Sequence, residues 1–378
     1  MKTERDIAAT TKPKGGDAGR PLLIVIAALC VVGLVMVMSA SSVDALRHYG
    51  SSWHFFIRQA VAVVLGGLAL WVTSRVDYHV WRRFTVPGLV VVLGMLVLVL
   101  VPGVGQTAYG ARRWLGGGPL QFQPSELAKL ALILFSADVL ARHPPSREGP
   151  MPLYVVAGAT ALVAVLVILE PDMGTMLITV GTIGAVLVLG GIPWMMLAAT
   201  GGVATFLGGV VAIFEPYRRQ RLLGFTDPFK DKALSGYQVV QSLVGLGSGG
   251  IKGSGLGTSK AKWGFLPNAH TDFIFAVIGE ELGLFGGIGV VGLFVALGVY
   301  GIRAASRAPD AFGALVAGGI TTWLVGQAAL NMATVVGLVP VTGVPLPFVS
   351  LGGTSTVFGM AAAGIVINIA RRGAAATR

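Results

Sequence analysis

Charge is scarce in this chain. Asp, Glu, Lys and Arg make up 12% of its 378 residues, whereas hydrophobic residues make up 54%. A soluble globular domain carries about 25% charged residues, and the mean hydropathy of +0.77 excludes that class. The chain has a single cysteine, Cys30, and this count excludes a disulfide framework within the chain and a cysteine-based metal site. The composition therefore indicates a membrane protein with many spans.

Apolar runs broken by charge, Pro or Gly mark the predicted spans, because a helix needs roughly 20 apolar residues to cross a bilayer. Ten runs qualify, at about 21–41, 57–74, 86–102, 124–141, 152–169, 172–191, 193–213, 273–301, 312–336 and 351–370. We therefore expect an all-α polytopic membrane protein with about ten transmembrane helices. The 55 glycines fit helices that pack closely in lipid.

Lysine and arginine are distributed unevenly between the two sides of these spans. With both termini inside, the short outer loops hold only Arg47, Arg112 and Arg113, and the inner segments hold many more cations. The positive-inside rule then places both termini in the cytoplasm. We expect a disordered cytoplasmic tail at 1–20, a membrane domain at 21–371 with a large extracellular loop at 214–272, and a cytoplasmic C-terminal tail at 372–378.

The predicted outer loop is basic. Its cations are Arg218, Arg219, Arg221, Lys230, Lys232, Lys252, Lys260 and Lys262. Such an excess favours an anionic partner at the outer surface, either lipid headgroups or a phosphorylated substrate. A solvated loop that happens to be basic explains the composition equally well.

Asp272 lies where this polar loop meets a very apolar segment. An unpaired carboxylate in hydrocarbon costs several kcal/mol, so the position alone makes Asp272 a functional candidate. Glu280 follows eight residues later on about the same helical face, where it can line the same cavity or make an interhelical hydrogen bond. His270 lacks clustered partners and does not indicate a metal site.

Two further groups of charged residues lie at predicted helix ends. Glu126 and Lys129 are three residues apart on one helical face, so they can form either an interfacial ion pair or part of a functional site. Glu170 and Asp172 lie in a tight turn between two spans. They can bind a divalent cation such as Mg or Mn or serve in acid/base chemistry, and a simple helix cap by Asp172 explains them as well.

Two glycine-rich segments interrupt the helical pattern. Residues 245–250 formally match the dinucleotide pattern GxGxxG but lack the required βαβ context, so we expect a flexible re-entrant or surface loop there, with a phosphate nest as the alternative. Residues 331–355 combine Asn331 with several Pro and Gly residues. Non-helical backbone at membrane depth needs a protein-lined cavity, so this segment is predicted to be a structured outer turn.

Several of these motifs together resemble the SEDS family (shape, elongation, division and sporulation) of bacterial peptidoglycan polymerases. The resemblance rests on Arg113-Trp114, the run 123–129, the run 171–175, Gly236-Tyr237-Gln238, the glycine-rich loop, the run 270–275 and the segment 331–355. Within the family the chain is more similar to the division branch, FtsW, than to the elongation branch, RodA. Asn268 and Leu351 depart from the commonest family pattern.

The resemblance implies a glycosyltransferase that joins lipid II disaccharides through β-1,4 bonds at the outer leaflet and releases undecaprenyl pyrophosphate. It assigns the essential aspartate to Asp272, which we interpret as the general base, with Arg113 and Lys129 as partners of the leaving pyrophosphate. Further candidate substrate-binding residues are Glu126, His270, Thr271, Glu280 and Ser350.

The same resemblance implies partners and a location. We expect a class B penicillin-binding protein, other membrane proteins of the division machinery and membrane lipids as partners, no nucleic acid, and a place in the bacterial cytoplasmic membrane at the division septum. An elongation polymerase of the RodA type is the nearest alternative. A lipid II flippase is the alternative from another class, motivated by Glu126 and Lys129 inside a span.

Overall fold

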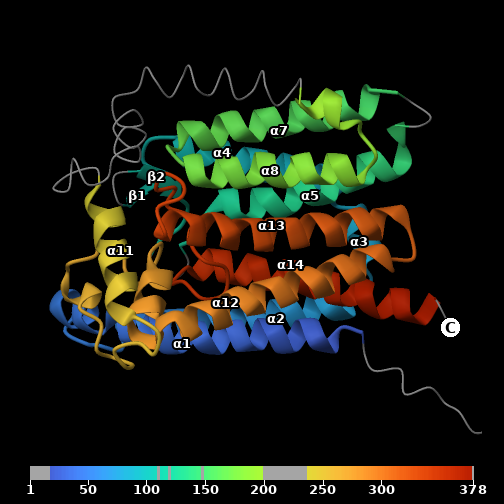
Figure 1. Ribbon diagram of the computed structural model, residues 1–378. Helices are drawn as coiled ribbons and strands as arrows, with labels where there is room; N and C mark the ends of the chain where they lie inside the picture. The colour runs from blue at the N-terminus through green and yellow to red at the C-terminus, as the bar shows by residue number, and fades with distance from the viewer. Residues whose placement is uncertain (1–17, 109–110, 118–120, 146–148, 199–235, 377–378) are drawn as a thin grey trace, which may run out of the picture.

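The computed structural model describes residues 18–108, 111–117, 121–145, 149–198 and 236–376, and most of them belong to helices (Figure 1). The helices that form the bundle are α1 (Arg20–Tyr49), α2 (His54–Arg75), α4 (Thr85–Leu100), α5 (Pro124–Arg142), α7 (Met151–Leu169), α8 (Met173–Leu189), α12 (Ile274–Ser306), α13 (Ala311–Val335) and α14 (Gly353–Ala376). Most of the predicted span 193–213, most of the tail 1–20 and the cations between 218 and 232 lie outside the described residues.

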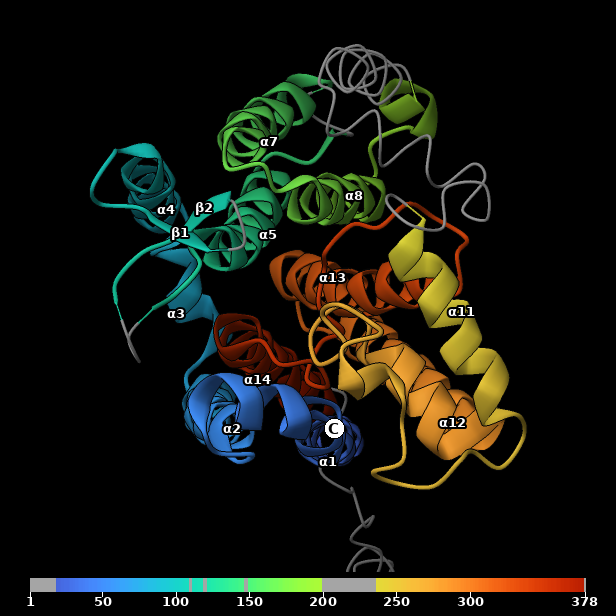
Figure 2. The same ribbon diagram turned by 90° about the vertical axis from the view of Figure 1, so that its left-hand side faces the viewer.

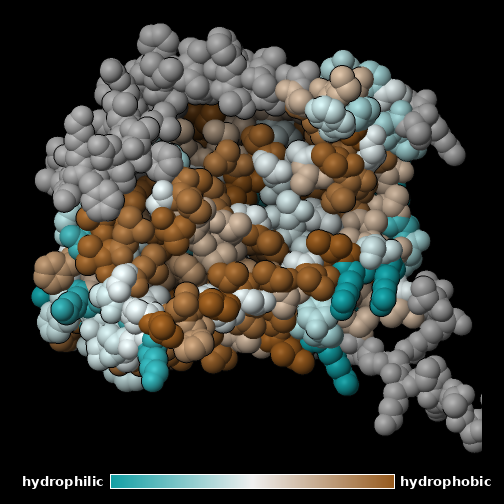
Figure 3. All heavy atoms as spheres, viewed as in Figure 1, coloured by the Kyte–Doolittle hydropathy of each residue, from teal (hydrophilic) through white to brown (hydrophobic). Residues whose placement is uncertain are grey.

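Nine of the ten predicted spans coincide with these helices, which confirms the all-α polytopic class. Six described helices are long and apolar enough to cross a membrane, and α4 and α8 are shorter apolar helices. α1 continues to Tyr49, eight residues past its predicted end at 41, because residues 42–49 contain no Pro or Gly and the left-handed Gly50 (φ 70°) is what ends the helix. Figure 3 shows hydrophobic side chains across the middle of one face, as a lipid-facing surface requires.

Prolines and aspartates set several helix starts. Pro124 occupies the first turn of α5, where its missing N–H costs nothing. Asp172 caps α8 by accepting from Thr175 N (3.1 Å), so the capping interpretation of this residue is confirmed. Asp310 caps α13 in the same way, accepting from Gly313 N at 2.7 Å.

Small residues let the helices approach closely. α14 packs along α2, and a Cβ added at Gly364 would lie 2.0 Å from Thr73 Oγ1. α13 lies between the helices α5 and α8 on one side and α12 and α14 on the other, which Figure 2 shows from the end of the bundle. α1 and α8 therefore lie on opposite sides of α13 and α14 in both views (Figures 1 and 2).

Three elements were not expected from the sequence. The antiparallel strands β1 (Gln106–Ala108) and β2 (Ala111–Trp114) form a hairpin, α3 (Tyr78–Arg82) is a short helix, and α11 (Tyr237–Gly249) packs on α12. The prediction of a loop at 245–250 was wrong for 245–249, which form the last turns of α11. The reason is packing: a Cβ on Gly249 would lie 2.0 Å from Gly279 O, so glycine here serves helix contact rather than loop flexibility.

Candidate functional site

Asp272 lies in a turn at residues 267–273, directly before α12. Asn331 of α13 donates from Nδ2 to Asp272 O and to Val344 O, both at 2.7 Å. Asn331 is 1% exposed, and its bond to Val344 O is buried. One buried amide therefore ties the turn that carries Asp272 to the segment 337–352, which connects α13 to α14.

Two more neutral side chains complete this connection. Ser350 donates from Oγ to Thr271 O (2.6 Å) and accepts from Leu346 N (2.8 Å). Gln59, in the second turn of α2, donates to Ser350 O at 3.1 Å and accepts from Gly352 N at 3.3 Å. We name Gln59, Asn331 and Ser350 the neutral clamp. It holds the main chain at 271 and 272, so the position of Asp272 is fixed through its backbone.

The connecting segment also approaches the Asp272 carboxylate directly. Gly343 has φ +73°, which only glycine adopts readily, and a Cβ at this position would lie 3.6 Å from Asp272 Oδ2. Next to it, Thr342 O meets the start of α8, because a Cβ on Gly174 would lie 2.4 Å from that oxygen. Asp272 and the N-terminus of α8 thus contact neighbouring residues of one loop.

Arg113 belongs to β2, and its side chain contacts the turn at 170–172 that precedes α8. Its guanidinium donates from Nε to Glu170 O (3.0 Å) and from Nη2 to Pro171 O, and Nη1 lies 3.9 Å from Asp172 Oδ2. The Arg113 side chain stays 28% exposed, so part of a cation reaches the surface here. The structure thus holds Arg113 at the turn before α8, and Gly174 in the first turn of that helix approaches Thr342, the residue next to Gly343.

Glu170 is fully buried in the same turn, and neither of its carboxyl oxygens has a hydrogen-bond partner. Burial, together with the neighbouring Asp172 carboxylate, raises the pKa of Glu170 to about 8, although Arg113 acts in the opposite direction. Within the described parts of the chain, no group of three or more His, Cys, Asp or Glu residues could hold a metal ion. A divalent cation on Glu170 and Asp172 stays a prediction.

Lys129 and Glu126 form the expected ion pair, with Nζ 2.7 Å from Oε1. The pair is buried inside the bundle, at 1% and 3% side-chain exposure, rather than at its surface. Lys129 also donates to Gln327 Oε1 (2.9 Å), and Gln327 in turn donates to Pro345 O (2.9 Å). Lys129 therefore supports the connecting segment through Gln327, which binds Pro345. Substrate binding by Lys129 and by Glu126 stays a prediction.

Glu280 is also buried, and its contacts are structural. Its carboxylate accepts from Ser259 Oγ (2.5 Å) and from Lys260 N (2.8 Å), so it caps the loop that follows α11. The adjacent Glu281 accepts from Ser39 Oγ (2.7 Å) and Ser259 N (3.1 Å). The two glutamates hold the loop before the Asp272 turn against α1 and α12.

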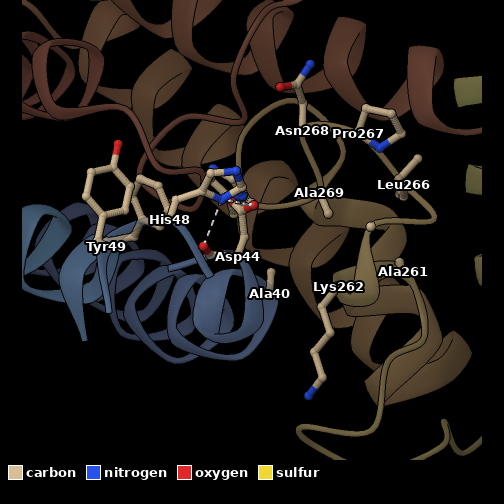
Figure 4. A pocket seen from close by; sticks show the side chains of 13 residues that line it. Ala40, Asp44, His48, Tyr49, Ala261, Lys262, Leu266, Pro267, Asn268 and Ala269 are labelled. Carbon is tan, nitrogen blue, oxygen red and sulfur yellow. Dashed lines mark hydrogen bonds and ion pairs between the residues drawn. The ribbon is translucent and has the colours of Figure 1, made fainter. Parts of the chain in front are cut away.

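His270 lines a cavity of about 360 Å³ on the other side of the Asp272 turn (Figure 4). The cavity lies between the end of α1, the start of α2 and residues 261–270. The His270 ring stacks on Phe55 with centroids 4.8 Å apart, and burial lowers the pKa of His270, with only partial opposition from Asp44. Thr271 is close by, with Oγ1 donating to Asn268 O at 3.2 Å.

Sequence reasoning missed two residues that position the site, Gln59 and Gln327. Both are polar amides at 0–1% exposure inside long apolar helices. A buried amide in a membrane span has to be hydrogen-bonded, so each was a signal that could have been read. No sequence pattern identified the partners of these amides. Gln327 binds a main-chain carbonyl 18 positions away, and Gln59 binds one 291 positions away.

Comparison with known proteins gives matches over nearly the whole chain. Residues 20–374 match the family model FTSW_RODA_SPOVE, described as cell cycle protein. The probable peptidoglycan glycosyltransferase FtsW of Geobacter metallireducens is 39% identical over 93% of this chain and 94% of its own length. Stage V sporulation protein E of Bacillus subtilis is 39% identical over 96% of this chain and 99% of its own length.

Solved structures agree with this result. A chain from a study of structural coordination of polymerization and crosslinking by a peptidoglycan synthase complex superposes with a TM-score of 0.76 at 31% identity, covering 93% of this chain and 97% of that one. The crystal structure of the Rod shape determining protein RodA of Thermus thermophilus gives a TM-score of 0.69 at 30% identity, covering 93% and 95%.

Proposed function

The chain belongs to the FtsW/RodA/SpoVE family of cell cycle proteins, and we propose that it is a peptidoglycan glycosyltransferase that polymerises lipid II for septal wall synthesis. The relatives named as probable peptidoglycan glycosyltransferases span over nine-tenths of this chain, so the match includes every element of the candidate site. The segment 331–355, the turn of Asp272 and the turn of Arg113 all fall within the matched residues 20–374.

In the proposed reaction, Asp272 is the general base. The acceptor sugar hydroxyl attacks the anomeric carbon of the donor, a C–O bond forms with inversion, and the bond to the pyrophosphate oxygen breaks. The hydroxyl proton passes to the Asp272 carboxylate, and the electron pair of the broken bond leaves on the pyrophosphate. A single displacement needs no enzyme nucleophile, so one carboxylate suffices.

The observation that carries this proposal is the neutral clamp. Asn331 and Ser350, which are themselves buried, bind the main-chain carbonyls of Asp272 and Thr271 at 2.7 and 2.6 Å. A carboxylate has an ordinary pKa near 4 and is a weak base toward a sugar hydroxyl, so placement must supply much of the rate acceleration. A rigidly held turn provides that placement.

Arg113 is the proposed partner of the leaving pyrophosphate. It is partly exposed and is held at the start of α8, the helix whose Gly174 approaches Thr342 O beside Gly343. A fixed guanidinium can stabilise charge that develops on the leaving group. Lys129 has no comparable exposure, so in this proposal it acts by holding Gln327 and Pro345 in place.

The proposal includes a membrane orientation and a partner. Both termini face the cytoplasm and the Asp272 end faces outward at the division septum, where lipid II is presented. A class B penicillin-binding protein crosslinks the product. The support for a partner is the similar chain that takes part in a peptidoglycan synthase complex.

The test is polymerisation of lipid II by the purified full chain in vesicles, with and without the transpeptidase partner. Asp272→Asn keeps the clamp, which binds the main chain, and removes the base. We expect a loss of about 10² to 10⁴ in rate. Polymerisation by Asp272→Asn at the wild-type rate would reject Asp272 as the base. Transbilayer movement of fluorescent lipid II without polymer from the wild type would favour a flippase instead.

A further inference from the structure

The cavity beside the Asp272 turn has the position and lining of a separate binding site. It has a volume of about 360 Å³, within the range of roughly 300–1,000 Å³ usual for small-molecule sites. Its walls come from α1, α2 and residues 261–270, and Figure 4 shows the α1 side chains Asp44, His48 and Tyr49 facing the loop that carries Asn268. Of the candidate site residues named from the sequence, His270 is the one that lines this cavity.

Its chemistry combines aromatic walls with few polar groups. Tyr49 is 54% exposed and meets Phe55 edge-on, with centroids 5.4 Å apart. Asp44 pairs with His48 at 3.0 Å but keeps 39% of its side chain exposed, so it can accept hydrogen bonds from a ligand. A pyranose ring, with apolar C–H faces and hydroxyl donors at its edges, matches such a lining.

Its charge balance argues against a phosphate ligand. Asp44 and Lys262 are the charged residues of the lining and cancel each other, and the Lys262 ammonium already donates to Gly257 O. An anionic pyrophosphate would face the Asp44 carboxylate here, whereas at the start of α8 it would meet the guanidinium of Arg113. The cavity therefore suits the uncharged part of the substrate.

The cavity and Arg113 are held by different parts of the bundle. The cavity is built on α1 and α2, whereas Arg113 is held at α8, and both views place α1 and α8 on opposite sides of α13 and α14 (Figures 1 and 2). His270 in its wall is two residues from Asp272, which limits the distance between their Cα atoms to about 7 Å.

From these observations we infer that the cavity is a saccharide subsite for the acceptor strand, which holds an amino-sugar ring near Asp272 while the donor pyrophosphate lies at Arg113. The inference rests on the proposed function and adds to it the side from which the acceptor enters. Tyr49 and Asp44 are its ligand-binding residues.

Binding is tested with N,N′-diacetylchitobiose, a soluble β-1,4-linked amino-sugar disaccharide, and the full chain in lipid nanodiscs. Saturation-transfer NMR is expected to detect the probe on wild type and on Asp272→Asn. Asp44→Asn and Tyr49→Ala are expected to weaken the signal at least about fivefold. Trp53→Ala is the matched control, because Trp53 is an equally exposed aromatic (55%) at the same end but does not line the cavity.

Kinetics give an independent measurement. Asp44→Asn is expected to raise the KM for the acceptor several-fold with kcat changed less than twofold, and inorganic pyrophosphate is expected not to displace the probe. No probe signal on wild type, unchanged binding by both cavity variants, or displacement by pyrophosphate would each overturn the subsite. None of these results bears on Asp272 as the base, which Asp272→Asn tests separately through polymerisation.

Discussion

The two ends of the bundle hold their polar groups in different ways. At the Asp272 end, the neutral clamp of Gln59, Asn331 and Ser350 is 0–2% exposed and binds main-chain carbonyls. At the opposite end, near α3 in Figure 1, His79 bridges two aspartates, with Nδ1 2.8 Å from Asp77 and Nε2 2.6 Å from Asp310. Arg372 joins Asp77 at 3.0 Å. We name Asp77, His79, Asp310 and Arg372 the charged latch.

Solvent access explains the difference. The side chains of the latch are 36–48% exposed, so their charges keep much of their hydration. A buried ion loses that hydration at a cost of several kcal/mol, which amides and hydroxyls avoid when they are hydrogen-bonded. A clamp of neutral groups also holds its geometry when pH or salt changes, and it adds no charge that would perturb the pKa of a nearby base.

The buried ion pair of Lys129 and Glu126 breaks this pattern, and its removal gives the largest expected effect. Lys129→Met leaves the Glu126 carboxylate buried without its cation, which typically costs about 3–5 kcal/mol of stability. The thermal unfolding midpoint of the detergent-solubilised chain measures this loss. The double variant Glu126→Gln with Lys129→Met removes both charges and is expected to recover most of the stability.

Activity separates the two interpretations of Lys129. If Lys129 acts by supporting Gln327, the double variant regains polymerisation together with stability. If Lys129 binds the pyrophosphate, the double variant is stable and inactive. The second result would show that a buried charge serves the chemistry rather than the fold.

Asn331→Ala tests the neutral clamp itself. It removes the bonds to Asp272 O and Val344 O, and a misplacement of about 1 Å at a reacting group can cost about 100-fold in rate. We expect a fall of that size in polymerisation with unchanged expression and membrane insertion.

Asn368→Ala is the matched control at the other end. Asn368 is also a buried amide with two bonds at the main chain, accepting from Tyr78 N (3.1 Å) and donating to Ser74 O (2.9 Å). We expect it to lower the unfolding temperature and leave the polymerisation rate of the folded protein within about twofold. Equal losses of activity in both asparagine variants would mean that the clamp has no special relation to Asp272.

The helices and the neutral clamp differ in how far the sequence predicted them. Helix positions followed from apolar run length, and the special status of Asp272 and residues 331–355 followed from polar or non-helical residues at membrane depth. The clamp could not be predicted, because its bonds to residues 271 and 272 and those made by Gln59 join side chains to main-chain atoms 59 to 293 positions away. The burial of Lys129 was missed for a related reason: spacing places Lys129 beside Glu126 on α5, but only the packing of α13 removes both from solvent.

Glu170 offers a smaller and pH-dependent test, since it is a buried carboxyl at the Asp272 end with no hydrogen bond. Its pKa is raised from 4.5 to about 8, so the folded state binds the proton more tightly than the unfolded state. Its contribution to stability is complete below about pH 4.5 and is lost as the pH rises toward 8. We expect the unfolding midpoint to fall across this window, and Glu170→Gln, which stays neutral, to remove that part of the slope. A slope unchanged by Glu170→Gln would mean that the carboxyl is solvated or paired in the folded chain.

The smallest expected effect is in the charged latch. Burial acts to lower the pKa of His79, but the hydrogen bonds to Asp77 and Asp310 outweigh it, so the pKa is raised above 6.5. The latch then stabilises the fold fully below that pH and loses its effect as His79 deprotonates at higher pH. Because these groups are more than a third exposed, we expect less than about 1 kcal/mol, reduced further by high salt. His79→Asn should remove this dependence on pH and salt without changing the polymerisation rate, whereas a loss of activity in His79→Asn would show that the two ends of the bundle are coupled.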